Sequence, residues 1–441
     1  MDITLRPARI CGTIDISGSK SHTIRALLIA LFANGVSTLH NALDSQDTQA
    51  CIELCRRLGA RITFKTDIPV PTLVIDSTAI ASEKEEITID CANSGTTLYL
   101  ASAMCAAGCT SKSIRFSGDE QLLKRPIGPL LESLRDLGAT IEPKDSTTIP
   151  FTIHGPLDGG RTSIECRTSQ YLSALLLACP MAQSDSTIEV PLLNEKPYVK
   201  MTQYWLEKQK MDYSYNDELS LFHIKGNQSY KPFEEHIGGD YSSATFFFCA
   251  AAITGGTITV NGLDRSDPQG DKAVLSVLEQ MGCTVEWRGS GVTLNGSQRL
   301  KAGEFDLNDI PDALPALAVA SCFADGETKL YNVKQARLKE TDRIATMAHC
   351  INELGGSAVE LDDGLEIHPV ESFTAKEIDG CNDHRIAMSM ALASLRSAGS
   401  LTIRGAQAAA VTFPTFFELL AKVSVSNEED PKTSLNSKTS V

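Results

Sequence analysis

The sequence alternates six times between a short polar segment and a long apolar stretch rich in alanine and leucine. Each apolar stretch is longer than an ordinary buried strand and predicts a buried helix. The copies begin at Ser21, Asn93, Thr168, Asp240, Asp312 and Asp383. Their spacing of about 72 residues indicates a fold assembled from copies of one supersecondary unit.

A second, shorter helical segment follows the first in each copy. Several of these segments end in leucine or methionine and glycine, as at 58–59 and 281–282, before a β-branched run. Glycine at this position is a typical helix C-cap, and β-branched residues favour a strand. Strands such as 257–260 follow the first helix. Each copy therefore predicts a β-α-β-α-β-β unit, and the chain an α/β (α+β) fold.

Six such units favour two domains of three, because one unit cannot bury both of its faces and a single core rarely grows to 441 residues. We expect one domain at 21–237 and a second at 1–20 plus 238–423. The sixth copy is poor in strands, so the first strand of the chain is expected to complete the second domain. The polar segment 424–441 lacks periodicity and is predicted to be disordered.

Composition excludes several classes of function. The formal net charge of −15 argues against a nucleic-acid-binding protein. No apolar stretch approaches the roughly 20 residues needed to span a bilayer, and the first residues lack a secretory signal, so we expect a cytoplasmic protein without membrane association. The 13 cysteines lack CxxC spacing and are expected to be reduced thiols. Neither a Walker loop nor a GxGxxG strand-to-helix motif occurs, and the histidines lack metal-ligand spacing, so we predict no cofactor and no metal.

The candidate chemistry lies at the helix starts, where backbone N–H groups and the positive end of the helix dipole favour anions. Lys20 precedes the first helix, and Ser21 and Arg25 share one face of it. A hydroxyl, a guanidinium and a helix N-terminus together can bind a phosphate or carboxylate. The alternative is a serine N-cap with solvated basic residues. We assign His22 a structural or solvent-facing role.

Two other helix starts carry small polar residues. Asn93 with Gly95 opens the second helix, and glycine lets a ligand approach the backbone closely. Thr168, Ser169 and Gln170 open the third. Each segment taken alone could be an ordinary cap. Arg125 precedes a proline that we expect to begin a helix.

The second half of the chain holds the candidate acid–base groups. Lys339 and Arg343 are four residues apart and predicted to share a helical face, with Glu340 beside them. This glutamate is either a general acid/base positioned by cations or part of a surface ion-pair network. Asp312 and Asp383 are either functional carboxylates or simple N-caps.

Taken together, these motifs resemble those of the 3-phosphoshikimate 1-carboxyvinyltransferase (EPSP synthase) family over residues 5–423. The matching motifs are Gly18 to Ser21 with Arg25, Asn93 to Thr96, Gly118-Asp119 leading to Arg125-Pro126, Thr168 to Gln170, Lys196 to Tyr198, Asp312, Lys339 to Arg343, and Asn382 to Arg385. The resemblance implies two similar domains, each an inside-out, barrel-like assembly of three βαβαββ units, which close on their ligands. It also implies transfer of the enolpyruvyl group of phosphoenolpyruvate to the 5-hydroxyl of 3-phosphoshikimate, with release of phosphate, in the shikimate pathway to chorismate and the aromatic amino acids. We expect a monomer.

The resemblance also assigns residues to the two substrates. The residues implied for 3-phosphoshikimate are Lys20, Ser21, Arg25, Thr168, Ser169, Gln170, Tyr198, Asp312, Gln335 and Lys339. Those implied for phosphoenolpyruvate are Lys20, Asn93, Gly95, Arg125, Gln170, Arg343 and Arg385. In catalysis, Asp312 would take the hydroxyl proton, and Glu340 with Lys20 would protonate the methylene carbon.

The sequence departs from the family pattern at four places. Val411 stands where a lysine is common, which predicts weaker phosphoenolpyruvate binding. Glu195 replaces a serine, and its carboxylate would repel the substrate's phosphate unless it turned away. Tyr99 and Leu100 replace an Arg-Pro pair, and Gln335 replaces an asparagine.

Three other functions compete with this interpretation. A catalytically silent 3-phosphoshikimate-binding homologue would explain Val411 and Glu195, but all the proposed acid–base residues are present. A UDP-N-acetylglucosamine enolpyruvyl transferase would carry Lys-Asn where this chain has Lys20 and Ser21. An RNA 3′-phosphate cyclase of related topology would need a nucleotidylation histidine and a basic RNA-binding face, and the sequence indicates neither.

Overall fold

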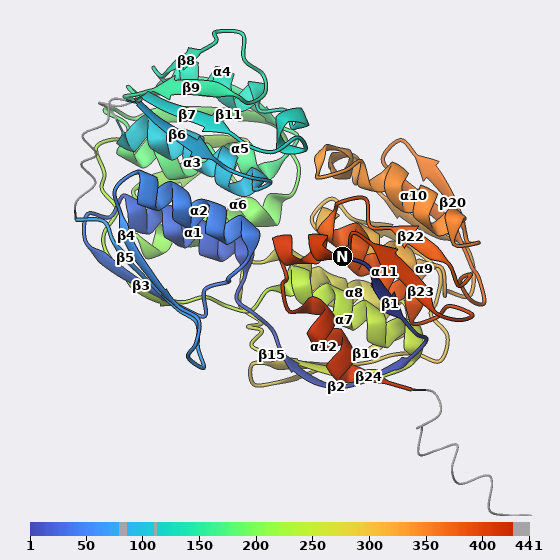
Figure 1. Ribbon diagram of the computed structural model, residues 1–441. Coiled ribbons are helices and arrows are strands. Elements are labelled where there is room, and N and C mark those ends of the chain that lie inside the picture. The colour runs from blue at the N-terminus through green and yellow to red at the C-terminus, as the bar shows by residue number, and fades with distance from the viewer. Residues whose placement is uncertain (79–85, 110–112, 427–441) are drawn as a thin grey trace, which may run out of the picture. The chain divides into compact units, whose positions relative to one another are not determined.

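The computed structural model describes residues 1–78, 86–109 and 113–426 (Figure 1). The chain forms two compact units. We call Gly18–Gly238 the N-terminal unit, and Met1–Ser17 with Gly239–Val441 the C-terminal unit. Each unit has its own hydrophobic core. The chain therefore passes from one unit to the other twice, after residue 17 and after residue 238.

Three helices form the centre of the N-terminal unit: α1 (Lys20–Leu31), α3 (Gly95–Gly108) and α5 (Ser169–Ala178). They are apolar on nearly all sides, and almost every residue in them is buried, as expected of helices at the centre of a core. Helices α2 (Gln46–Arg57), α4 (Gly128–Asp136) and α6 (Lys196–Lys208) are each buried on one face and exposed on the other. The central helices therefore form the interior of this unit, and the outer helices cover it.

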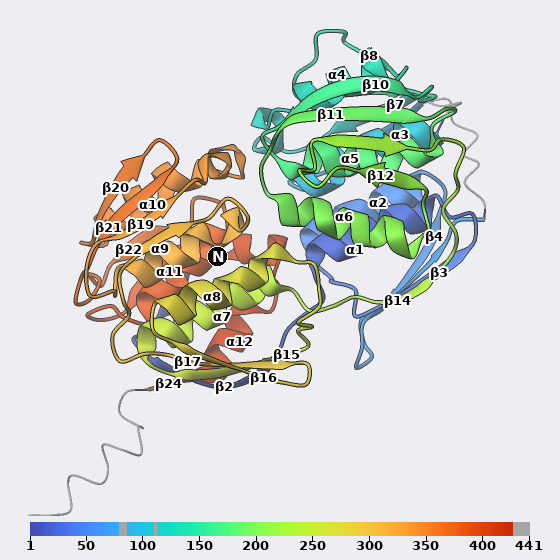
Figure 2. The ribbon, with the colours of Figure 1, turned by 180° about the vertical axis from the view of Figure 1, so that it is seen from behind.

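Three four-stranded sheets cover these helices, in the orders β14-β3-β5-β4, β6-β7-β9-β8 and β10-β11-β13-β12. Their strands alternate buried and exposed residues, so one face of each sheet packs on the core and the other faces solvent. Figure 2 shows β10 and β11 beside α5. The strands are β3 (Val36–His40), β4 (Arg61–Lys65), β5 (Thr72–Asp76), β6 (Glu86–Asp90), β7 (Ser113–Ser117), β8 (Thr140–Glu142), β9 (Phe151–His154), β10 (Gly160–Cys166), β11 (Ser186–Leu193), β12 (Tyr213–Tyr215), β13 (Leu221–Ile224) and β14 (Glu234–His236).

The C-terminal unit repeats this plan around α7 (Tyr241–Thr254), α9 (Leu314–Ser321) and α11 (His384–Ser394). Its outer helices are α8 (Val274–Gln280), α10 (Arg343–Glu353) and α12 (Phe416–Val423). The sheets have the orders β16-β17-β15-β2-β24, β18-β19-β21-β20 and β1-β23-β22. Their strands are β1 (Ile3–Leu5), β2 (Arg9–Asp15), β15 (Thr257–Asn261), β16 (Thr284–Arg288), β17 (Gly291–Asn295), β18 (Glu304–Asp306), β19 (Thr328–Tyr331), β20 (Ser357–Leu361), β21 (Gly364–His368), β22 (Glu377–Asp379), β23 (Leu401–Arg404) and β24 (Ser424–Val425).

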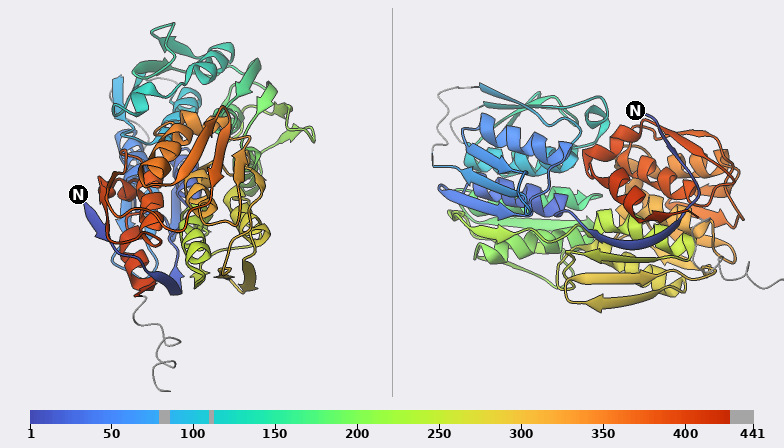
Figure 3. Two further views of the ribbon diagram at one scale, coloured as in Figure 1. Left: turned by 90° about the vertical axis from the view of Figure 1, so that its right-hand side faces the viewer. Right: turned by 60° about the horizontal axis from the view of Figure 1, so that its bottom comes forward.

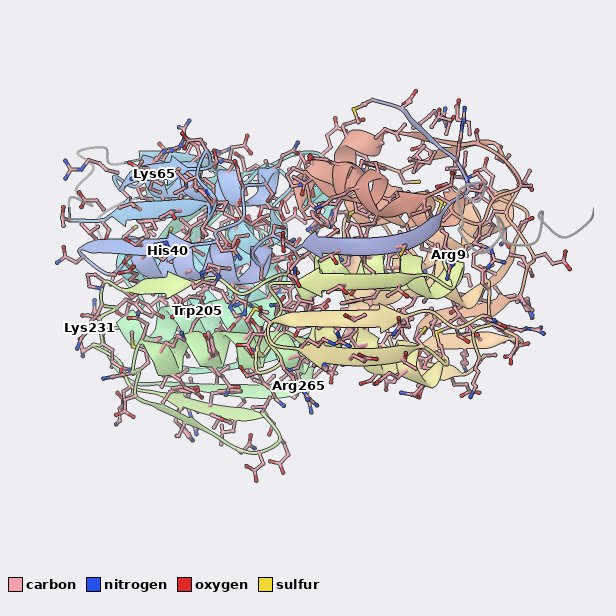
Figure 4. All side chains as sticks on the ribbon, turned by 90° about the horizontal axis from the view of Figure 1, so that it is seen from below. Arg9, His40, Lys65, Trp205, Lys231 and Arg265 are labelled. Atoms are coloured by element: carbon pink, nitrogen blue, oxygen red, sulfur yellow. The ribbon has the colours of Figure 1, made fainter. Side chains whose placement is uncertain are left out.

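In one repeat of each unit, the opening strand comes from a distant part of the chain. The complete β-α-β-α-β-β order is seen in β6-α3-β7-α4-β8-β9, where β6 and β7 are parallel. The first repeat takes its opening strand from β14, parallel to β3. Strand β2, dark blue in Figure 3, instead pairs in parallel with β15 in the fourth repeat. Arg9 at the start of β2, labelled in Figure 4, donates a 2.9 Å hydrogen bond to the carbonyl of Gly255 in the same unit.

The structure corrects two of the sequence-based expectations, on the unit boundary and on the C-terminal tail. Residues 18–20 and 238 belong to the N-terminal unit, which runs from Gly18 to Gly238, and α1 begins at Lys20 and continues into that core. Ser424 and Val425 form β24 against β2, since β2 would otherwise present an unpaired edge, so the expectation of disorder is wrong for these two residues. The rest of the predicted disordered tail, from 427, lies outside the described residues. Within the described ranges, none of the helices combines the length and apolarity that crossing a membrane requires.

Candidate active site

The start of α1 presents Lys20 as its first residue. Its ammonium lies 3.0 Å from the carboxylate of Asp47, and both side chains are largely buried. Ser21 is not the N-cap: that position belongs to Ser19, whose side chain makes no capping hydrogen bond. The hydroxyl of Ser21 is therefore not required for helix capping.

Arg25 lies one turn further along α1 and is 1% exposed. Nε donates to Thr202 Oγ1 at 2.9 Å, Nη1 to the Ser21 carbonyl at 3.0 Å, and Nη2 to the Tyr198 carbonyl at 3.4 Å. Burial lowers the pKa of Arg25 to about 10. A cation surrounded by hydroxyl and carbonyl oxygens favours the arrival of an anionic ligand.

His22 has the structural role expected of it. The ring is 3% exposed, and its Nδ1 accepts a 2.9 Å hydrogen bond from Nε1 of Trp205, which is labelled in Figure 4. This hydrogen bond from Trp205 on α6 fixes the orientation of the His22 ring.

Asn93 and Arg125 form a pair at the start of α3. Arg125 Nη2 donates to Asn93 Oδ1 at 2.8 Å, and Asn93 Nδ2 donates to Asp119 Oδ2 at 2.7 Å. A Cβ on Gly95 would lie only 2.5 Å from Arg125 Nη1. Glycine is therefore needed for the guanidinium to lie against this helix N-terminus. The predicted helix start at Pro126 is wrong: Arg125 ends the 3-10 helix η1 (Leu122–Lys124), and α4 begins only at Gly128.

The start of α5 holds an internal anion. Thr168 is the N-cap, and its hydroxyl accepts a hydrogen bond from the Gln170 N–H. Glu195 is 1% exposed, and its Oε2 accepts from Ser169 Oγ at 2.8 Å, Ser169 N at 3.1 Å and Thr168 Oγ1 at 3.2 Å. The carboxylate does not turn away from these groups. Tyr198 stands three residues further along, and its N–H donates to the Glu195 carbonyl.

Arg343 is the centre of the charged group in the C-terminal unit. It is 1% exposed and begins α10. Nε donates to Asp383 Oδ2 at 2.9 Å, Nη1 to Asp312 Oδ1 at 3.0 Å and Nη2 to Glu340 Oε2 at 2.5 Å. Arg385 Nη2 donates to the other oxygen of Asp312 at 2.9 Å. We call Asp312, Glu340, Arg343, Asp383 and Arg385 the Arg343 cluster.

The expectations for this segment are partly corrected. Asp312 is not an N-cap: it lies within the 3-10 helix η4 (Pro311–Ala313), with both carboxylate oxygens directed at arginines. Asp383 is the N-cap of α11 and also binds Arg343. Lys339 follows the 3-10 helix η5 (Lys334–Leu338) and shares no helix with Arg343, because α10 starts only after the Asp342 N-cap. Its ammonium nevertheless lies 3.8 Å from Asp312 Oδ1.

The Arg343 cluster shifts the protonation of its members. Burial would lower the pKa of Arg343, but the carboxylates of Asp383, Glu340 and Asp312 raise it above its ordinary value. Burial would raise the pKa of Asp383, yet the Arg343 cation holds it below its ordinary value. Both groups are therefore charged at neutral pH.

Several buried polar atoms have no hydrogen-bond partner among the described residues. Among them are Gln170 Oε1, Gln335 Oε1, Arg385 Nε and both ring nitrogens of His384. Gln335 uses its Nε2 on the carbonyl of Asn308 at 3.1 Å. Since buried polar groups are normally satisfied, such atoms are candidates for ligand contacts. The sequence does not single out His384, because this histidine has no metal-ligand spacing to a cysteine or carboxylate pair.

The group formed by Glu340, Asp383 and His384 suits an arginine better than a metal ion. One ligand atom each from Glu340, Asp383 and His384 lies within 4.8 Å of the other two. Arg343 already donates to Glu340 and to both oxygens of Asp383. A metal ion would have to displace this guanidinium, so we assign no metal here.

Val411 ends the 3-10 helix η6 (Ala406–Val411) and is partly exposed. None of the 13 cysteines, all of which lie in the described part of the chain, forms a disulfide in the structure.

Comparisons with known proteins agree over nearly the whole chain. Residues 5–420 match the family described as EPSP synthase (3-phosphoshikimate 1-carboxyvinyltransferase). The 3-phosphoshikimate 1-carboxyvinyltransferase of Acetivibrio thermocellus is 44% identical over 425 residues, covering 96% of this chain and 98% of the relative. That of Ruminiclostridium cellulolyticum is 43% identical over 419 residues, covering 95% and 97%. A solved structure of EPSP synthase from Acinetobacter baumannii superposes with a TM-score of 0.80 at 27% identity, covering 96% of this chain and 98% of that one.

Proposed function

Because the chain belongs to the EPSP synthase (3-phosphoshikimate 1-carboxyvinyltransferase) family, we propose that the residues described above carry out its enolpyruvyl transfer. The family assignment, the fold class and the enzymatic activity expected from the sequence are confirmed by these similarities. The chain is an EPSP synthase of the shikimate pathway. We further propose that the enzyme acts as a monomer in the cytoplasm.

We assign 3-phosphoshikimate to the starts of α1 and α5. Lys20, Ser21 and Arg25 would bind its carboxylate and hydroxyl groups, since a guanidinium presents paired donors to a carboxylate. Thr168, Ser169 and Gln170 would bind its phosphate at a helix N-terminus. Tyr198 from the N-terminal unit and Asp312, Gln335 and Lys339 from the C-terminal unit complete the set. The buried, unpartnered Gln170 Oε1 and Gln335 Oε1 support this assignment.

We assign phosphoenolpyruvate to the arginines. Arg125 with Asn93 and Gly95, together with Lys20 and Gln170, would bind it from the N-terminal unit, and Arg343 and Arg385 from the C-terminal unit. Arg385 supports this assignment because its Nε is a buried donor with no partner in the described part of the chain.

The reaction needs a base at the 5-hydroxyl and an acid at the methylene carbon. Asp312 would accept the hydroxyl proton while the oxygen bonds to C2 of phosphoenolpyruvate, and Glu340 with Lys20 would protonate the methylene carbon. In the elimination the groups would exchange roles: a methyl proton of the tetrahedral intermediate returns to Glu340 with Lys20, and phosphate leaves with the proton that Asp312 had accepted.

Both carboxylate oxygens of Asp312 accept hydrogen bonds from arginines in this structure. Arg343 donates to Oδ1 and Arg385 donates to Oδ2. Phosphoenolpyruvate anions that took these guanidinium donors would free Asp312 to act as a base. Substrate binding would thus activate the base.

The observation that carries the proposal is the Arg343 cluster, in which two buried arginines hold the two candidate acid–base carboxylates. The test is phosphate release by the purified protein, with each substrate withheld in turn. We expect release only when both substrates are present. The alternative of a silent 3-phosphoshikimate-binding homologue draws on the Glu195 carboxylate at the donors that we assign to the phosphate, and binding of 3-phosphoshikimate without turnover at high phosphoenolpyruvate would favour it.

A further inference from the structure

Glu195 is held in an unusual position by the backbone. It follows β11 and is the N-cap residue of α6, with a left-handed backbone conformation at φ 57°. Residues other than glycine and asparagine seldom adopt this backbone conformation. Its carboxylate makes no capping bond to α6 and instead reaches the first turn of α5. The conformation is therefore coupled to a contact with a different helix.

The carboxylate occupies the donors that an incoming phosphate would use. One oxygen, Oε2, accepts three hydrogen bonds. The donors are the hydroxyls of Thr168 and Ser169 and the backbone N–H of Ser169. A backbone N–H at a helix N-terminus together with two hydroxyls is a typical phosphate-binding set. Glu195 thus supplies an internal anion where a ligand anion is expected.

We propose that Glu195 is a specificity-determining residue, which competes with the phosphate of 3-phosphoshikimate for the donors at the start of α5. The inference rests on the proposed function, which assigns the phosphate to Thr168 and Ser169. To bind there, the phosphate must displace the carboxylate or lie beside it, and two anions in a buried environment repel strongly. Glu195 therefore lowers the affinity for the phosphorylated substrate and leaves the affinity for its unphosphorylated counterpart, shikimate, nearly unchanged.

A purely structural role is the competing explanation. In that case Glu195 would cap α5 and hold the Thr168 and Ser169 hydroxyls, and removing it would lower stability without improving the binding of either ligand. The two roles differ in sign for 3-phosphoshikimate, so one set of variants separates them.

The test uses the full chain with Glu195→Ser, which removes the charge, and Glu195→Gln, which keeps the size if the serine variant does not fold. Glu189→Ser is the matched control, because Glu189 is exposed on the neighbouring β11. Calorimetric titrations measure the Kd of 3-phosphoshikimate and of shikimate for each protein, and steady-state kinetics measure both Michaelis constants. Thermal unfolding is recorded in parallel.

We expect Glu195→Ser to tighten 3-phosphoshikimate binding by at least about tenfold, an effect of about 1.4 kcal/mol. Shikimate affinity and the KM for phosphoenolpyruvate should stay within about twofold, and Glu189→Ser should match the parent. Glu195→Gln should tighten the same ligand by a smaller factor.

Unchanged or weaker 3-phosphoshikimate binding in the Glu195 variants would overturn the inference, as would an equal gain for shikimate. If the parent protein still turned over both substrates, the proposed function would stand while the inference failed. If no variant bound 3-phosphoshikimate and none showed turnover, both would be rejected.

Discussion

The pH dependence of stability should reveal His384, which is buried at the start of α11. The ring is 2% exposed, and neither nitrogen has a hydrogen-bond partner among the described residues. Burial lowers the pKa of His384 from 6.5 to about 3, and Asp383 and Glu340 offset only part of this shift. Between these two values the unfolded chain binds a proton that the folded protein excludes. Stability must therefore fall as the pH drops below about 6.5.

The size of this effect is set by the two pKa values. Each unit of difference corresponds to about 1.36 kcal/mol, so His384 should remove about 3 kcal/mol of unfolding free energy between pH 7 and pH 4. Asp383 contributes little in this window: its pKa is lowered in the folded state from the ordinary value of 3.8, so the stability that it contributes is complete above that value and is lost as the pH falls through and below it.

The assay is urea unfolding followed by circular dichroism at several pH values, for the parent protein and His384→Gln. The glutamine variant should lose less stability on acidification, by about the amount given above. His349→Gln is the control, because the side chain of His349 is 72% exposed. If His384→Gln and the parent lost stability in parallel between pH 7 and pH 4, the account of a neutral buried imidazole would be refuted.

Three further substitutions test the substrate assignments. Gly95→Ala would place a Cβ 2.5 Å from Arg125 Nη1 and should raise the KM for phosphoenolpyruvate by roughly tenfold, with the KM for 3-phosphoshikimate little changed; equal values for parent and variant would contradict this. Val411→Lys adds a cation and should lower the KM for phosphoenolpyruvate by roughly tenfold or more, and an unchanged KM rejects that role. Burial holds the pKa of Arg25 at about 10 instead of 12.5, which corresponds to a folding cost of about 3 kcal/mol. Arg25→Met should therefore leave the melting temperature unchanged or higher while weakening 3-phosphoshikimate binding at least about tenfold, and retained binding with a lower melting temperature would oppose the assignment.

The repeats were predictable because the central helices are apolar on nearly all sides, as in α3 and α7. This pattern is local, and so are the glycine C-caps and β-branched strands after them. The exchange of β14 for β2 was only half predictable. The shortage of strands in the sixth repeat pointed to a role for the N-terminal segment, and β1 does pair with β23 of that repeat, while β2 pairs with β15 of the fourth. Nothing local indicated that β14 pairs with β3.

In the site, residue types were predictable and their partners were not. The motif around Arg343 indicated a cation beside Glu340. The hydrogen bonds that Arg343 donates to Asp312 and Asp383, however, join segments distant in sequence. Helical spacing wrongly placed Lys339 on α10, because Asp342 caps that helix after the lysine. Glu195 was identified as a departure, yet only the structure places its carboxylate on the hydroxyls of α5.

Replacement of Asp312 tests the central claim most directly, since both of its oxygens are held by arginines and we assign it as the base. The measurement is kcat for phosphate release by Asp312→Asn with both substrates saturating, with Asp362→Asn at a side chain 81% exposed as the control. The account predicts a loss of about 100-fold or more in the first variant and none in the second. A kcat for Asp312→Asn within about tenfold of the parent value would contradict it.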